Sequence, residues 1–225
     1  MIAPRVPTGR VAALLSLLLP LVVAGDTPHG TKSPNQSTMT TERISLSATF
    51  QRVGTELSVR YSVDNQSDDT LLIYDRIWRW GQGGRPFVDP QRVYRSVNGS
   101  GLRLLLGAAS VPPMKACFQI IPAVIKVDPY SVLRGEVSVP VPVTEYNCYE
   151  SAHGESNAQI TQDVELFVDY SIATGVELFP SKAFPSAFQT NGSPPRKRLR
   201  SGQSRLALEV LRRTSAFPRL WLPGE

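Results

Sequence analysis

Alternation of apolar and polar residues constrains the fold of this chain more than any other sequence feature. In the segment LSVRYSVD (57–64) every second side chain is apolar. A period of two is that of a β-strand, whose side chains point alternately to the two faces of a sheet. The same alternation recurs at residues 44–50, 137–143, 164–168 and 206–210. No segment has a convincing helical period of 3.6 residues, so the sequence predicts an all-β fold.

Turn signals divide the chain into eight or nine short strands, which is the pattern of a β-sandwich. Residues 65–69 (NQSDD) and 98–101 (NGSG) are the clearest turns.

The clean strand and Asn-rich turn within 59–73 resemble exported immunoglobulin-like or fibronectin-like modules of bacteria. The resemblance covers 42–172 and a final strand, and it implies an immunoglobulin-like antiparallel β-sandwich. The Cys-Trp-Cys arrangement of antibody domains is missing.

Several strand assignments follow from the pattern. Residues 70–80 are expected to form one strand, and residues 118–127 and 136–144 are expected to form two further strands that could pair antiparallel. Pro140 and Pro142 have no N–H to donate, so the second of these runs is predicted to be an edge strand or to be only partly paired. Residues 179–204 have no period and are expected to form a long loop before the last strand.

The first 25 residues have the three parts of a secretory signal peptide. Arg5 and Arg10 are the only charges, an apolar run of residues 11–24 follows, and small residues precede Asp26. The run is too short for a typical spanning helix, although an uncleaved anchor is the alternative. Residues 26–41 are expected to be a flexible leader, 42–213 the sandwich domain and 214–225 a tail. A periplasmic or secreted protein is expected, with no transmembrane segment after cleavage.

The two cysteines, Cys117 and Cys148, are expected to form a disulfide. An exported chain meets an oxidising compartment, where a cysteine pair is oxidised by default. If residues 118–127 and 136–144 pair antiparallel, the cysteines meet at the open end. The alternatives are two buried thiols or thiol chemistry, but the sequence contains no C-x-x-C.

The charge of the mature chain is only mildly basic. The whole chain has 24 Lys and Arg against 19 Asp and Glu; without Arg5 and Arg10, 22 basic residues face 19 acidic ones, a net charge of +3. Together with export, this argues against nucleic acid as a partner. The basic residues of one run are candidates for binding lipid phosphate, acidic polysaccharide or an acidic protein; a solvated loop and a processing site are the alternatives. They are Arg196, Lys197, Arg198 and Arg200.

An aromatic segment, YDRIWRW (74–80), is the strongest candidate for a ligand-binding surface. On one continuous strand, Tyr74, Arg76, Trp78 and Trp80 would project to the same face. Such a face can stack on sugars or anchor a protein partner. The alternative is that Trp78 packs between the sheets.

Catalytic and metal-binding patterns are weak. His29 and His153 belong to no zinc-binding spacing, and no G-x-S-x-G is present. Asp163 and Glu165 are spaced to share a solvated strand face, and residues 64–69 could surround calcium but read better as a turn. No cofactor, metal or catalytic residue is predicted.

The sequence therefore favours an exported, non-enzymatic binding or structural module of the cell envelope, with a protein or polysaccharide partner. A carbohydrate-binding module that uses residues 74–80, and an enzyme with a site built from loops, are the alternatives.

Overall fold

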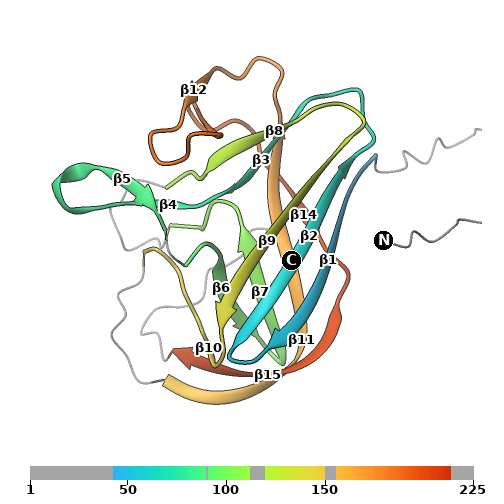
Figure 1. Cartoon of the computed structure of the whole chain (residues 1–225), viewed down its shortest axis with the longest axis vertical. Coiled ribbons are helices and arrows are strands. Elements are labelled where there is room, and N and C mark those ends of the chain that lie inside the picture. The colour runs from blue at the N-terminus through green and yellow to red at the C-terminus, as the bar shows by residue number, and fades with distance from the viewer. Residues whose placement is uncertain (1–42, 90, 112–119, 150–155, 214–225) are drawn as a thin grey trace, which may run out of the picture. The chain divides into compact units, whose positions relative to one another are not determined.

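The computed structural model describes residues 43–89, 91–111, 120–149 and 156–213. These residues are almost entirely strands, with one short 3-10 turn, η1 (Gln82–Gly84). The strands form sheets of three, ten and two strands, and the two larger sheets are stacked in a sandwich-like arrangement (Figure 1). The prediction of an all-β fold is therefore confirmed. No helix among the described residues is long and apolar enough to cross a membrane.

The three-stranded sheet has the order β1 (Ile44–Val53), β2 (Glu56–Asn65), β9 (Ser131–Pro140). Both pairings are antiparallel and extend over the full length of β2. The apolar residues of the 57–63 alternation are buried, whereas Arg60 is exposed. In this sheet β9 pairs only with β2, which confirms the prediction that the proline-containing run is an edge strand.

The ten-stranded sheet is built around the 17-residue strand β11 (Ser156–Ile172). Because β11 is so long, each of its edges accommodates two shorter strands placed end to end. One edge pairs with β15 and then β14, and the other pairs with β7 and then β3. The other strands extend this arrangement: β8 pairs with β3, β13 with β8, β12 with β13, β6 with β7, and β10 with β15.

The bounds of these strands are β3 (Leu71–Arg76), β6 (Tyr94–Asn98), β7 (Gly101–Leu106), β8 (Ala123–Val127), β10 (Val143–Thr144), β12 (Leu178–Pro180), β13 (Phe188–Thr190), β14 (Lys197–Arg200) and β15 (Ser204–Arg213). The third sheet is a hairpin of β4 (Trp78–Trp80) and β5 (Pro86–Val88).

Two strand pairings are parallel, so the purely antiparallel arrangement expected from the sequence is wrong. The strand β7 runs parallel to β11, and β10 runs parallel to β15. Parallel neighbours require long connections between them. Here the chain between β7 and β11 passes through β8, β9 and β10 before it returns. Local turn signals carry no information about such a return.

The expected pairing of residues 118–127 with 136–144 is also wrong. In the structure β8 pairs with β3 and β13 in the larger sheet, whereas β9 pairs with β2 in the smaller one. The two strands therefore face each other across the core, where Val127 and Val137 belong to the same cluster. A period of two identifies the buried side chains, but it does not say which sheet each strand joins.

The segment 179–204 is not a structureless loop. It contains β13 and β14 and most of β12. Each of these strands has only three or four residues, which is too short for a period of two to be recognised. The predicted signal peptide, leader and tail lie outside the described residues, as do Cys117, His29 and His153.

The main core fills the space between the two larger sheets. It contains Leu57, Val59 and Val63 from the smaller sheet and Val164, Leu166 and Val168 from the larger one, all with no exposed surface. The second face of β11 is also buried, although it carries Glu165 and Asp169. Those two carboxylates determine the structure of the basic run described below.

Candidate functional site

The β4–β5 hairpin, residues 78–88, forms an arm that is hydrogen-bonded to neither of the larger sheets (Figure 1). Its cross-strand pairs are Trp78 with Val88, Arg79 with Phe87, and Trp80 with Pro86. The connection between the strands passes through Gly83 and Gly84, whose φ values of 75° and 70° favour glycine. We call this hairpin the β4–β5 arm.

The root of the arm is fixed by Trp78. Its indole is 8% exposed, packs with Ala123 and Ala187, and donates a hydrogen bond of 2.8 Å from Nε1 to the carbonyl of Ile121. Trp80 is 58% exposed, and its ring meets that of Trp78 edge to face at 5.0 Å. The exposed indole is therefore held in place by a buried one.

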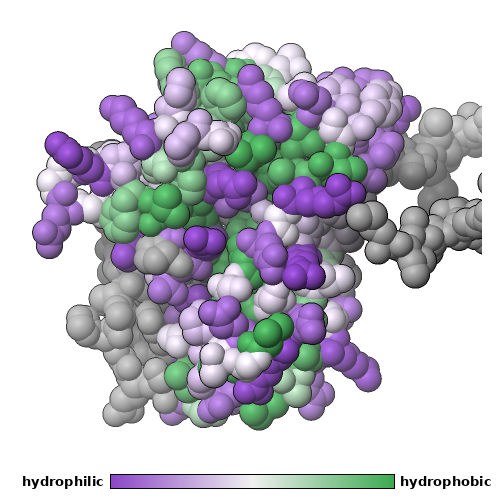
Figure 2. Space-filling model, viewed as in Figure 1, coloured by the Kyte–Doolittle hydropathy of each residue, from purple (hydrophilic) through white to green (hydrophobic). Residues whose placement is uncertain are grey.

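The two faces of the arm differ in character. Pro86 and the exposed Val88 lie on the face of Trp80, because directly paired and alternate strand residues point the same way. On the opposite face the Arg79 guanidinium lies 4.8 Å from the centre of the Phe87 ring. Figure 2 shows hydrophobic side chains at the base of the arm, at the left of the view, and hydrophilic ones at its outer end.

The continuous aromatic face expected over residues 74–80 does not form. The chain changes partners at Ile77, because β3 ends at Arg76 and β4 pairs only with β5. Tyr74 is fully buried in another cluster, and Arg76 is half-buried and pairs with the Asp75 carboxylate at 3.0 Å. Of the four predicted residues, Trp78 lies in the core, as the alternative interpretation held, and Trp80 is the one with a largely exposed ring.

The basic run is not a solvated loop, because it forms β14 along the edge of β11. Arg198 donates two hydrogen bonds to the buried carboxylate of Asp169, at 2.6 and 3.1 Å. Arg200 forms an ion pair with the buried carboxylate of Glu165. A buried carboxylate requires compensation by a cation or donors, and these arginines supply it. Lys197 is exposed, and the Arg196 guanidinium lies 5.9 Å from the Tyr74 ring centre.

The remaining sequence candidates have structural partners. Glu165 is buried, so it and Asp163 do not share a solvated face. The side chain of Asn65 donates to the carbonyls of Asp69 (2.8 Å) and Asp128 (3.0 Å), which confirms the predicted turn. Among the described residues, no group of three or more His, Cys, Asp and Glu could hold a metal ion.

Cys148 is half-buried, and burial raises the pKa of its thiol to about 11. Its predicted partner, Cys117, lies outside the described residues, so the disulfide stays a prediction. The hydroxyl of the neighbouring Tyr149 accepts a hydrogen bond from the backbone N–H of Ile120. Ile120 is three residues from Cys117, a separation that a chain spans in about 10 Å at most.

A bridge between the two larger sheets was not anticipated from the sequence. The ring of Tyr61 on β2 extends over Gly135 on β9, and its hydroxyl donates to the carboxylate of Asp75 on β3 at 2.7 Å. A Cβ atom at position 135 would lie 2.3 Å from the Tyr61 ring. Burial raises the pKa of Asp75, while the Arg76 guanidinium lowers it to a smaller extent.

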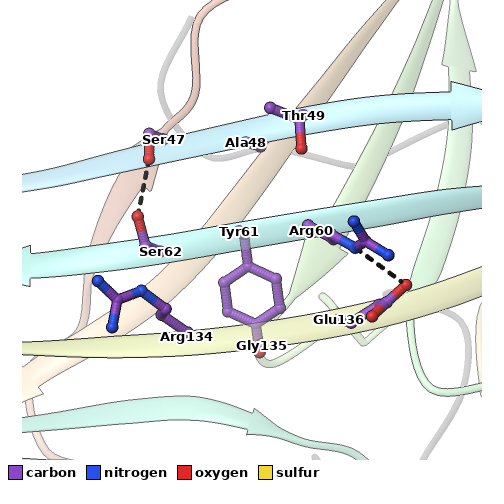
Figure 3. A pocket seen from close by; sticks show the side chains of 9 residues that line it. All are labelled: Ser47, Ala48, Thr49, Arg60, Tyr61, Ser62, Arg134, Gly135 and Glu136. Atoms are coloured by element: carbon purple, nitrogen blue, oxygen red, sulfur yellow. Dashed lines mark hydrogen bonds and ion pairs between the residues drawn. The ribbon is translucent and has the colours of Figure 1, made fainter. Parts of the chain in front are cut away.

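The outer face of the three-stranded sheet contains a hollow of about 540 Å³, which we call the trough (Figure 3). Strand register places two rows of polar side chains across the sheet. One row is Ser47, Ser62 and Arg134, and the other is Thr49, Arg60 and Glu136. Between them the side chains point inward, so backbone forms the floor. The alternation indicated which residues face outward, but only the register shows that these six lie together.

Comparison with known proteins adds no family to this description: no family model, no curated protein and no solved structure matches the chain.

Proposed function

We propose that this chain is an exported, non-enzymatic binding module of the cell envelope, built on an immunoglobulin-like sandwich, that contacts a protein partner through the β4–β5 arm. The observation that carries the proposal is the exposed indole of Trp80, held against the buried Trp78. Tryptophan is among the residues that most often dominate the binding energy of protein interfaces.

The arm has the composition of such an interface. Trp80, Pro86 and Val88 form an apolar centre, and the exposed Arg85, next to Pro86 in the chain, supplies a polar group at its edge. Because Trp78 already holds the Trp80 ring, binding loses less side-chain entropy than it would for a freely rotating residue.

Export is supported by the pattern of residues 1–25. A charged start, a short apolar run and small residues before Asp26 are typical of a cleaved signal peptide. On this proposal, the partner lies in the periplasm or outside the cell.

A carbohydrate ligand for the arm is the second candidate, favoured by the same exposed indole, on whose face a sugar ring can stack. Since Tyr74 and Trp78 are buried, this candidate rests on one aromatic ring rather than on the extended face expected from the sequence.

The experiment is a comparative pull-down from envelope extract of the source organism with the mature chain and two variants. Trp80→Ala removes the proposed anchor, and Ile160→Ala removes an equally exposed apolar side chain on β11. We expect one set of proteins to be retained by the wild type and Ile160→Ala and lost with Trp80→Ala. Retention of the same proteins by all three chains would contradict the proposal. If the wild-type chain still retains carbohydrate from an extract that has been treated with protease, and Trp80→Ala does not, the carbohydrate ligand would be favoured.

A further inference from the structure

The trough is a second surface, separate from the β4–β5 arm, and its six wall residues come from three strands. On a β-strand, side chains two residues apart on the same face are about 7 Å apart, and three strands span about 10 Å. The two rows flank the hollow of about 540 Å³, which is large enough for a sugar ring with its substituents.

Hydroxyl groups line both walls. The Ser47 and Ser62 hydroxyls lie 2.8 Å apart and hydrogen-bond to each other, which leaves one O–H and several lone pairs of the pair free (Figure 3). Thr49 on the opposite wall is exposed and supplies a third hydroxyl. Such groups both donate to and accept from the hydroxyls of a saccharide.

The two walls differ in charge, because the arginine of one wall is paired with a carboxylate and the arginine of the other, within the part of the chain that the structure describes, is not. Arg60 pairs with Glu136 at 3.4 Å, and Glu136 also accepts a hydrogen bond from Ser58. Across the trough, Arg134 is exposed, and no carboxylate among the described residues pairs with it. Figure 3 shows Arg134 next to Ser62.

From this arrangement we infer that the trough binds a saccharide that carries a carboxylate, a sugar of the uronic acid type. The Arg134 guanidinium pairs with the ligand carboxylate, for which its planar fork of donors is suited. The serine and threonine hydroxyls bind the sugar hydroxyls. Glu136, which is paired with Arg60, accepts a hydrogen bond from a further sugar hydroxyl.

The test is a titration of the mature chain with trigalacturonate, followed by backbone amide NMR and calorimetry. We expect shifts of the amides of Ala48, Tyr61 and Gly135, which form the floor. Neutral galactotriose should bind at least about tenfold more weakly, because it lacks the partner of Arg134.

Two variants that each remove one positive charge distinguish binding in the trough from a general attraction between the protein and an anionic ligand. Arg134→Gln should weaken trigalacturonate binding at least about tenfold. Arg52→Gln removes an exposed arginine of the same sheet, outside the trough, and should leave binding unchanged. Trp80→Ala should also bind normally, so failure of the arm proposal and failure of this one are distinguishable.

Four results would overturn the inference. These are no binding of trigalacturonate, equal losses in Arg134→Gln and Arg52→Gln, equal binding of galactotriose, or equally tight binding of inorganic sulfate that depends on Arg134. The last would identify a simple anion site.

Discussion

At the scale of single residues, buried carboxylates and their partners account for features that otherwise look like surface chemistry. Asp169 is buried on β11, and it accepts hydrogen bonds from Arg198 and from the backbone N–H of Ala108. Gly107 permits this, since a Cβ atom there would lie 2.3 Å from the Asp169 carboxylate. Arg198 and Arg200 of the basic run therefore stabilise the larger sheet by pairing with its buried carboxylates.

Replacement of Arg198 tests that role. In Arg198→Ala the buried Asp169 carboxylate loses its cation, and we expect the free energy of unfolding to fall by about 3 kcal/mol. Urea denaturation measures the change. The control is Arg43→Ala, which breaks the exposed pair with Asp68 at 2.9 Å and should change the free energy by less than about 1 kcal/mol. Equal effects of the two variants would contradict the structural role of the basic run.

Asp75 makes the stability depend on pH. Because burial raises its pKa above the ordinary 3.8, the folded protein binds more protons than the unfolded chain between 3.8 and the raised value. The contribution of Asp75 to the free energy of unfolding therefore falls as the pH rises through that window. Asp75→Asn should flatten this part of the curve of stability against pH. Tyr61→Phe, which removes the hydrogen bond to Asp75, should extend the loss to higher pH. Parallel curves for the wild type and Asp75→Asn would contradict the assignment.

At the scale of elements, the arm is a short hairpin whose two tryptophans have different roles. Trp78→Ala removes a buried ring and should lower the free energy of unfolding by about 3–5 kcal/mol. Trp80→Ala removes a largely exposed ring and should lower it by less than about 1 kcal/mol. Chemical denaturation of both variants checks this difference. A large loss in Trp80→Ala would mean that the arm's exposed face is part of the fold.

The packing of β9 on β2 depends on the missing side chain at position 135. Gly135→Ala would place a methyl group against the Tyr61 ring, and we expect a loss of about 1–3 kcal/mol from the strain of moving that ring. Thermal unfolding measures the loss. In the double variant Gly135→Ala with Tyr61→Ala, the glycine replacement should have little further effect. An undiminished effect in that background would contradict the proposed contact.

The sequence identified several long strands but not the short ones, and it indicated only residues 164–168 of the longest strand, β11. The period of two identified β1, β2 and β15, because each has ten residues and one face in the core. It did not identify β14, because this strand has four residues and three of them are basic, so no alternation of apolar and polar residues is visible. The pairing of the strands could not be predicted from the sequence for a different reason. The trough and the Tyr61–Asp75 bridge depend on which strands lie side by side, and local patterns do not contain that information.

At the scale of the whole molecule, the chain is a β-sandwich, and we propose that it is exported through a cleaved signal peptide and used for binding. The disulfide prediction now has a different geometric basis from the hairpin first expected, because β8 and β9 lie in different sheets. Its support is the hydrogen bond from Ile120 to Tyr149, because these residues follow Cys117 by three positions and Cys148 by one in the sequence.

Export is the claim on which the proposed site of action depends, and one measurement tests it directly. It is the intact mass, under non-reducing conditions, of the full-length chain expressed in its source organism and recovered from each cell fraction. We expect a species outside the cytoplasm that begins at Asp26 and is lighter by two hydrogen atoms than the reduced chain. A cytoplasmic species that retains residues 1–25 and both free thiols would contradict it.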